Sequence, residues 1–331
     1  MVENPIFAIR CGRFGTVVHG VGEKSGSALL VCSASTLRRI SFRSPYAPAE
    51  FLPRPGDLPH RRSDRMSDFV FCARGTGESL SGNMLDNVSR RLHGVTVEQV
   101  IYSASISLDN AARDPLAPSG DNSATQVVNW LRTRIAALHP GDRYIVLGYS
   151  LGAVGVNRWL KTSPDTAGCR MVGTIADPSR RAGVSYGLPI APNRFGIYAT
   201  GGTGTVPNDQ RSPVPLFEIA SPGDVMTSCP AVSPLHAFAG PVMAFTLTDP
   251  NALIAQLVAG GIDDVVSDLA NAGHWFDPGW WSWPADLAGF ANGQHTTAYG
   301  LPMWRDSANR PVSGIDLLAR VCSWKMSAVP A

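Results

Sequence analysis

Charged residues are scarce in this sequence. Aspartate, glutamate, lysine and arginine together make up 16% of the chain, with a net charge of +2, whereas a typical globular protein has about a quarter. A balance so close to neutral, without a basic helix, excludes the electrostatic footprint of nucleic-acid binding. A weakly charged surface is compatible with neutral or apolar substrates, and equally with a soluble protein rich in loops.

Long apolar runs and paired cysteine motifs are also absent. No stretch approaches the length of a membrane-spanning helix, and residues 1–5 lack the basic and apolar regions of a signal peptide. We therefore expect no integral membrane segment and no export by an ordinary signal peptide. The spacing of the six cysteines contains no C-x-x-C pair, so neither a metal site nor any other cofactor is expected. The cysteines are Cys11, Cys32, Cys72, Cys169, Cys229 and Cys322.

The 331 residues, 44% of them hydrophobic, suffice for one large α/β domain and a smaller unit. We predict a small β-rich N-terminal extension with its linker at residues 1–64 and an α/β-hydrolase catalytic domain at residues 65–331. Within the extension, residues 14–19 and 27–32 have strand composition, and the glycine-containing segment 20–26 between them is typical of a hairpin.

Apolar strand-like runs alternate with segments of helical spacing from residue 68 onward. Such alternation predicts a central parallel sheet with helices on both faces. Expected strands are residues 68–73, 100–104, 144–147, 171–176 and 215–220. Expected helices are residues 123–138, 153–160, 252–258, 265–270 and 315–321.

The segment Gly148-Tyr149-Ser150-Leu151-Gly152 joins a predicted strand to a predicted helix. This is the G-x-S-x-G pattern in the strand-turn-helix context that a nucleophile elbow requires. Glycines flank the serine because side chains at those positions would collide in so tight a turn. Ser150 is therefore the candidate nucleophile.

A glycine-bracketed turn, Gly75-Thr76-Gly77, follows the first predicted core strand. Such a turn can leave backbone N–H groups free to face an oxyanion. We expect the oxyanion donors to be the N–H of Leu151, directly after the nucleophile, and that of Thr76 or a neighbour.

A serine nucleophile needs a histidine base, and the histidine needs a carboxylate to fix its tautomer. In α/β-hydrolases the chain order is serine, acid, histidine. Two aspartates directly follow core strands after Ser150; Asp224 is favoured, with Asp177 as the alternative. Three histidines follow Ser150, and the late His295 is favoured over His274 and His236.

Aromatic residues crowd into the segment 275–283, shortly before His295. Two interpretations remain open for them. They could pack beneath a long loop, or some of them, with Trp280 and Trp281 as candidates, could bind the acyl chain of a substrate.

These motifs resemble those of cutinase-type serine esterases and, more closely, of the lysin B esterases of mycobacteriophages. The resemblance covers roughly residues 68–305 and includes residues 71–78, the elbow, Asp177-Pro178-Ser179-Arg180, Gly223-Asp224-Val225-Met226 and His295. It differs at Leu151, where lysins usually have glutamine, and at Ala176-Asp177-Pro178, where they have Gly-Asn-Pro. Only Cys229 lies near the aspartate that cutinases bracket with two cysteines.

The resemblance implies Ser150 as nucleophile, Asp224 as acid and His295 as base in the hydrolysis of long-chain lipid esters. For a lysin these are mycolyl esters of cell-wall arabinogalactan in the envelope, cut during phage lysis. The resemblance further implies synthesis in the host cytoplasm and action once the membrane is breached, with the N-terminal extension as a candidate for cell-wall contact. Alternatives are a cutinase-like lipase or acyltransferase, and a non-catalytic envelope-binding protein on a hydrolase scaffold.

Overall fold

The computed structural model describes residues 66–162, 166–199, 212, 214–244 and 277–327, together with two short backbone segments near the N-terminus. Contacts divide the chain into the units Met1–Arg62 and Ser63–Ala331. In the first unit, β1 (Ile9–Cys11) pairs antiparallel with β2 (Thr16–Val18). The strand expected at residues 14–19 thus overlaps β2, whereas the one expected at residues 27–32 lies outside the described residues.

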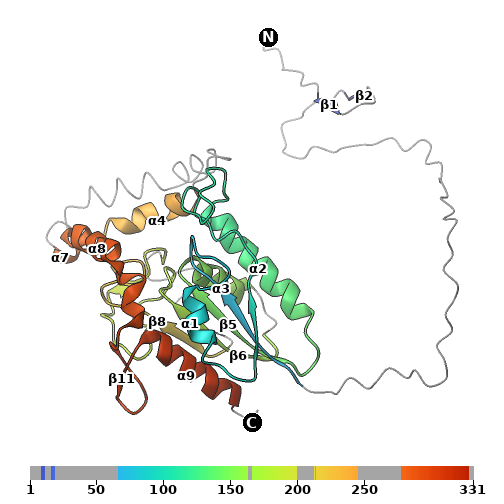
Figure 1. Ribbon diagram of the computed structural model, residues 1–331. Helices are drawn as coiled ribbons and strands as arrows, with labels where there is room; N and C mark the ends of the chain where they lie inside the picture. Colours follow the sequence, from blue (N-terminus) through green and yellow to red (C-terminus); the bar gives the residue numbers. More distant parts are fainter. Residues whose placement is uncertain are drawn as a thin grey trace, which may run out of the picture. The chain divides into compact units, whose positions relative to one another are not determined.

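A five-stranded parallel sheet forms the centre of the second unit, in the order β4-β3-β5-β6-β8 (Figure 1). Its strands are β3 (Asp68–Ala73), β4 (Thr96–Gln99), β5 (Arg143–Tyr149), β6 (Cys169–Ile175) and β8 (Leu216–Ile219). Most residues of the inner strands β3, β5 and β6 are buried, on both faces of the sheet, as expected for a parallel sheet covered by helices. The predicted α/β-hydrolase-type fold is therefore confirmed.

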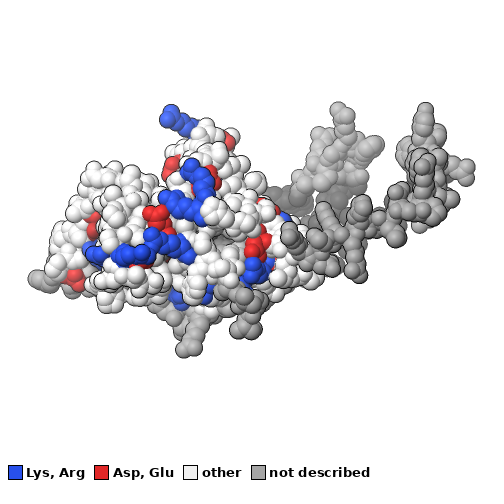
Figure 2. Space-filling view, turned by 60° about the horizontal axis from the view of Figure 1, so that its bottom comes forward, with Lys and Arg blue, Asp and Glu red and all other residues white. Residues whose placement is uncertain are grey.

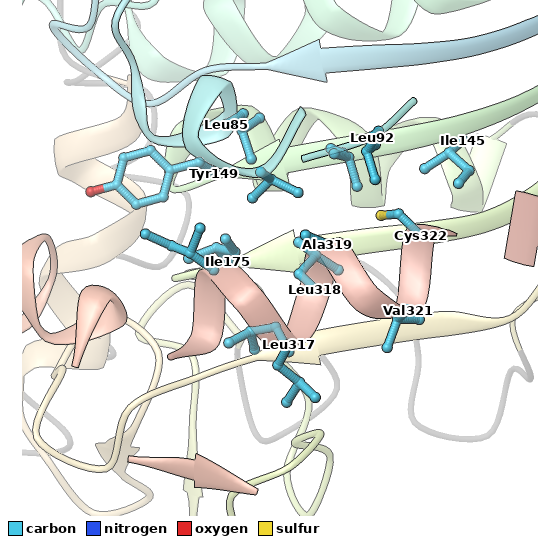
Figure 3. Packing of buried hydrophobic residues seen from close by; sticks show 14 of the residues in the cluster. Leu85, Leu92, Ile145, Tyr149, Ile175, Leu317, Leu318, Ala319, Val321 and Cys322 are labelled. Carbon is cyan, nitrogen blue, oxygen red and sulfur yellow. The ribbon is translucent and has the colours of Figure 1, made fainter. Parts of the chain in front are cut away.

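Helices cover both faces of this sheet (Figure 1). One face packs against α2 (Gly120–Ala136) and α3 (Leu151–Thr162), and the other against α1 (Met84–Ser89) and α9 (Gly314–Ser327). Alternate residues of β3 serve the two layers: Phe71 belongs to the α2–α3 side, and Cys72 to the α1–α9 side. Figure 3 shows the second layer, where Leu85, Leu318 and Cys322 meet the sheet.

Smaller elements surround this core. They are β7 (Arg194–Phe195), β9 (Cys229–Pro230), α4 (Leu235–Ala244), α7 (Pro278–Trp281), α8 (Trp283–Gly289), the irregular turn Phe290–Gln294, the 3₁₀ turn Thr297–Gly300, β10 (Trp304–Arg305) and β11 (Pro311–Val312). The helices predicted at residues 252–258 and 265–270 lie outside the described residues. Neither α1 nor α4 was expected, although Asn83 is a good N-cap and accepts a hydrogen bond from the Asp86 N–H.

The strand expected at residues 100–104 is wrong in its position. β4 is an edge strand that ends at Gln99, and one further ladder-type bond joins the Val100 N–H to the Cys72 carbonyl. Beyond that point the carbonyls of Val100 and Tyr102 accept hydrogen bonds from the buried Arg74 guanidinium. An arginine therefore replaces a neighbouring strand as their partner, and the chain turns away from the sheet.

Charges of both signs lie in small groups on a mostly uncharged surface in the view of Figure 2. Within the part of the chain that the structure describes, no helix combines the length and apolarity needed to cross a membrane.

Candidate active site

Ser150 occupies a sharp turn between β5 and α3. Its φ of +51° lies in the left-handed region, which is strained for a residue with a side chain. The flanking glycines are required sterically: a Cβ at Gly148 would lie 2.6 Å from the Ala153 Cα, and one at Gly152 would overlap the Ala73 carbonyl oxygen. The turn thereby holds the serine at the carboxyl edge of the sheet.

His295 connects Ser150 to Asp224. The His295 Nε2 lies 2.8 Å from the Ser150 Oγ, and its Nδ1 lies 3.0 Å from each carboxylate oxygen of Asp224. With the proton on Nδ1 donated to Asp224, Nε2 is free to accept the hydroxyl proton of the serine. Asp224 is fully buried, and the other two are nearly so. The structure thus brings together residues separated by 74 and 71 positions in the sequence, which form one hydrogen-bonded chain.

Tyrosines hold both the acid and the base. The Tyr299 hydroxyl donates to Asp224 Oδ2 at 2.7 Å, and burial raises the pKa of Tyr299 well above its usual value, so this hydroxyl keeps its proton. The Met226 N–H donates to the other carboxylate oxygen at 3.0 Å. Tyr149 stacks against the His295 ring and donates its hydroxyl to the His295 carbonyl at 2.9 Å. The acid therefore has donors on both oxygens, and the imidazole plane is fixed.

Two arginines clamp the loop that carries Asp224. The buried Arg180 donates from Nε to the Thr227 carbonyl and from Nη2 to the Arg194 carbonyl, both at 2.7 Å. Arg194 in turn donates to the Ser228 carbonyl at 2.9 Å. Because backbone carbonyls are the acceptors, these bonds fix the path of the loop rather than neutralise the aspartate.

Two backbone N–H groups beside Ser150 are unoccupied. Within the described residues, no acceptor lies on the N–H of Leu151 or on that of Thr76, and the buried Thr76 hydroxyl also lacks a partner. The Thr76 loop lies against the nucleophile, since a Cβ at Gly75 would be 3.2 Å from the Ser150 Cβ. Unused donors on two sides of one hydroxyl are what an oxyanion requires.

The Thr76 loop is held from both ends. Arg74 donates from Nε to the Glu78 carbonyl at 2.7 Å, and the Glu78 carboxylate accepts the N–H groups of Gly75 at 2.7 Å and Met84 at 2.9 Å. These bonds use the N–H of Gly75 and leave that of Thr76 free.

The alternative acid, Asp177, has hydrogen-bond partners other than the candidate histidines. Its carboxylate accepts hydrogen bonds from the Asn157 amide and from the Ser179 N–H. Burial raises its pKa to about 7. Neither of these partners is a histidine, so Asp177 lies outside the hydrogen-bonded chain of Ser150, His295 and Asp224.

The alternative histidines have different outcomes. Both ring nitrogens of His236 face backbone carbonyls, those of Ile197 at 2.9 Å and Pro230 at 3.1 Å, and the ring stacks on Phe195. His274 lies outside the described residues.

An apolar cavity of about 230 Å³ adjoins Ser150. Its walls come from α3, from the loops after β4, β6 and β8, and from α4. The lining includes Ile106, Leu151, Val154, Tyr198, Met226 and Met243. α4 had a recognisable signal, apolar residues at helical spacing from Leu235 to Met243, but Gly240-Pro241 within it obscured the pattern. No sequence signal pointed to Tyr198, because it lies in a segment without regular secondary structure.

Neither Trp280 nor Trp281 lines this cavity. Trp280 is buried in α7, whereas Trp281 is 61% exposed. The packing interpretation suits Trp280, and a role of either tryptophan in substrate binding stays a prediction. Among the side chains that the structure describes, no group of three or more potential ligands could hold a metal ion.

No protein-family model and no curated protein matches this chain. Solved structures with a similar arrangement include lysin B from Mycobacteriophage D29, with 19% identity, a TM-score of 0.44 and coverage of 67% of this chain and 98% of that one. A cutinase-like protein from Cryptococcus sp. has 20% identity and a TM-score of 0.38, over 49% and 79% of the two chains.

The catalytic core domain of acetyl xylan esterase from Trichoderma reesei has 15% identity and a TM-score of 0.39, over 62% of this chain and 98% of that one. Because these identities and TM-scores are low, the esterase activity is argued from the geometry of the site.

A buried carboxyl group behind the site predicts a pH-dependent stability. Glu218 on β8 is 2% exposed, its Oε2 has no hydrogen-bond donor among the described residues, and Arg181 lies 4.0 Å away. Burial, and then the nearby Asp177, raise the pKa of Glu218 to about 8, while Arg181 and Arg180 oppose the shift. A carboxyl pKa raised by folding means that stability falls as pH rises from the unfolded value of 4.5 through about 8.

Glu218→Gln should therefore gain stability relative to the unaltered chain at pH 9 by on the order of 1 kcal/mol, and much less at pH 5. Denaturant unfolding at both pH values measures this. Glu98→Gln is the matched control, since Glu98 is a partly exposed strand residue paired with Arg134 at 2.7 Å, and its replacement should give no gain. An equal effect of Glu218→Gln at the two pH values would contradict the assignment.

Proposed function

We propose that this protein is a serine esterase that hydrolyses lipid esters with long acyl chains. The observation that carries the proposal is the continuous hydrogen-bonded chain from Ser150 through His295 to Asp224. The unoccupied N–H groups beside the serine and the apolar cavity next to it support the same chemistry.

In the proposed reaction the Ser150 Oγ attacks the ester carbonyl carbon, and His295 Nε2 takes the hydroxyl proton. Asp224 stabilises the resulting imidazolium through Nδ1. The N–H groups of Leu151 and Thr76 stabilise the oxyanion, and the Thr76 hydroxyl is a third available donor. His295 then protonates the departing alkoxide, which leaves an acyl-serine.

Water completes the cycle. His295 Nε2 takes a proton from the water as it attacks the acyl carbonyl, and returns that proton to the Ser150 oxygen as the acid is released. The products are one alcohol and one carboxylic acid.

The cavity supports an acyl chain as the part of the substrate that is bound. Its lining is almost entirely apolar, and each buried CH₂ group contributes about 0.8 kcal/mol. We propose that the physiological esters are those of a cell envelope, in particular mycolyl esters of arabinogalactan cleaved during phage lysis. This finer assignment is supported by the sequence motifs; it includes action on the envelope after membrane breach and cell-wall contact by residues 1–64.

Ser150→Ala should lower ester hydrolysis by at least about a thousandfold, because the nucleophile is lost. The measurements are hydrolysis of a chromogenic ester and labelling by a fluorophosphonate, with circular dichroism as the check on folding. Ser179→Ala, at a buried serine outside the hydrogen-bonded chain, is the control and should still be labelled by the fluorophosphonate. A folded Ser150→Ala protein that remains active would contradict the mechanism. If the unaltered chain is folded but is not labelled by the fluorophosphonate, the result would favour a non-catalytic binding protein.

Asp224→Asn should reduce kcat by on the order of 10³–10⁴, because an amide leaves the imidazole in the wrong tautomer. Asp177→Asn should reduce it far less, since Asp177 bonds to Asn157 and Ser179 rather than to the histidine. Steady-state kinetics of the two variants decides between them. The reverse order of effects would assign the acid to Asp177.

The substrate proposal is tested with purified mycobacterial envelope. The unaltered chain should release free mycolic acid, identified by mass spectrometry, whereas Ser150→Ala should release none. Transfer of the acyl group to added sugar instead of water would indicate an acyltransferase. Hydrolysis of simple esters without release from envelope would indicate a cutinase-like lipase.

A further inference from the structure

The apolar cavity lies against the first turn of α3, next to the nucleophile. Leu151 and Val154 both line it, and Arg158 occupies the next position on the same helix face. Leu151 and Arg158 are seven residues apart, which corresponds to about 10 Å along the axis. An acyl chain attached to Ser150 would therefore pass Val154 and approach the level of Arg158.

Tyr198 lines the cavity and is anchored at that level. Its hydroxyl accepts a hydrogen bond from Arg158 Nη2 at 2.8 Å and donates to Asp121 Oδ1 at 3.1 Å. The Arg158 guanidinium also bonds Asp121 and lies 5.6 Å from the centre of the Tyr198 ring. A tyrosine bound at its hydroxyl by an ion pair has its ring direction fixed.

The first turn of α2 packs against residues that line the cavity. Asp121, which holds Tyr198, follows Gly120 in that turn. A Cβ at Gly120 would lie 2.6 Å from the Met243 Sδ and 3.3 Å from the Ile106 Cγ1. Met243 and Ile106 also line the cavity. Three lining residues from three segments therefore converge on one helix turn.

The backbone at Tyr198 is fixed as firmly as its hydroxyl. The Tyr198 N–H donates to the Pro178 carbonyl at 2.8 Å, and the Ile197 N–H donates to the Met226 carbonyl at 2.9 Å. Pro178 and Met226 line the cavity themselves. The ring is thus part of a rigid wall that connects directly to the loop of Asp224.

We propose that the ring of Tyr198, held by Arg158 and Asp121, forms the end wall of the acyl cavity and sets the longest acyl chain that the site holds in full. This assignment deepens the proposed esterase function and rests on it. It makes Tyr198 a determinant of specificity that takes no part in the chemical step.

The test is a series of p-nitrophenyl esters from acetate to palmitate, measured as kcat/KM. Tyr198→Ala should raise the ratio of palmitate to butyrate hydrolysis by about tenfold, the effect of holding roughly two more CH₂ groups. Tyr198→Phe, which keeps the ring, should leave the ratio close to that of the unaltered chain. Gly120→Ala should lower the ratio, because it pushes Met243 into the cavity.

Tyr186→Ala is the matched control. Tyr186 is a partly buried tyrosine that packs edge-on against Phe217 on the opposite side of the sheet, so its loss should change stability without changing the ratio. An active, folded Tyr198→Ala variant with an unchanged ratio would overturn the assignment of Tyr198 alone. Absence of hydrolysis of every ester by the unaltered chain would instead contradict the proposed function, and the assignment with it.

Discussion

The left-handed backbone of Ser150 is the constraint on which the site depends. A residue held in this region costs on the order of 1–3 kcal/mol and persists only where its surroundings determine it. Here the Ser150 N–H donates to the Ile175 carbonyl of β6 at 3.1 Å, and its own carbonyl accepts the N–H groups of Ala153 and Val154. The strained serine is thus held by the neighbouring strand on one side and by the start of α3 on the other.

The remaining parts of the site are positioned relative to this serine by loops at the same edge of the sheet. The loop after β3 presents the free N–H of Thr76, while the N–H of Gly75 donates to the Glu78 carboxylate and that of Gly77 to the Ala104 carbonyl. The loop after β8 presents Asp224 because Arg180 and Tyr299 hold it from two directions. The buried guanidinium groups of Arg74 and Arg180 donate to backbone carbonyls and so hold the paths of these irregular loops.

Much of this arrangement could be predicted from the sequence because it depends on local patterns. The strand-turn-helix around Ser150 follows from an apolar run, two glycines and helical spacing, and the fold predicted from that alternation is confirmed. The order serine, acid, histidine leaves two aspartates and three histidines, of which Asp224 and His295 are favoured by their positions along the chain, and the structure brings these two together with the serine. Their catalytic roles remain predictions for the experiments above.

Features that depend on contacts between distant segments could not be predicted. No strand forms at residues 100–104, because the Val100 carbonyl accepts a hydrogen bond from Arg74, which lies 26 positions earlier in the chain. Tyr198 lines the cavity with its hydroxyl bonded to Arg158 and Asp121, which belong to two different helices. The spacing of residues in an irregular segment does not predict hydrogen-bond partners on distant helices.

The most direct test of the account is a crystal structure of the protein after reaction with a long-chain alkyl phosphonate. We predict phosphorus bonded to the Ser150 Oγ, the phosphonyl oxygen within hydrogen-bond distance of the N–H groups of Thr76 and Leu151, and the alkyl chain in the cavity beside α3. A phosphonate attached to another residue, or a phosphonyl oxygen facing away from both N–H groups, would contradict it.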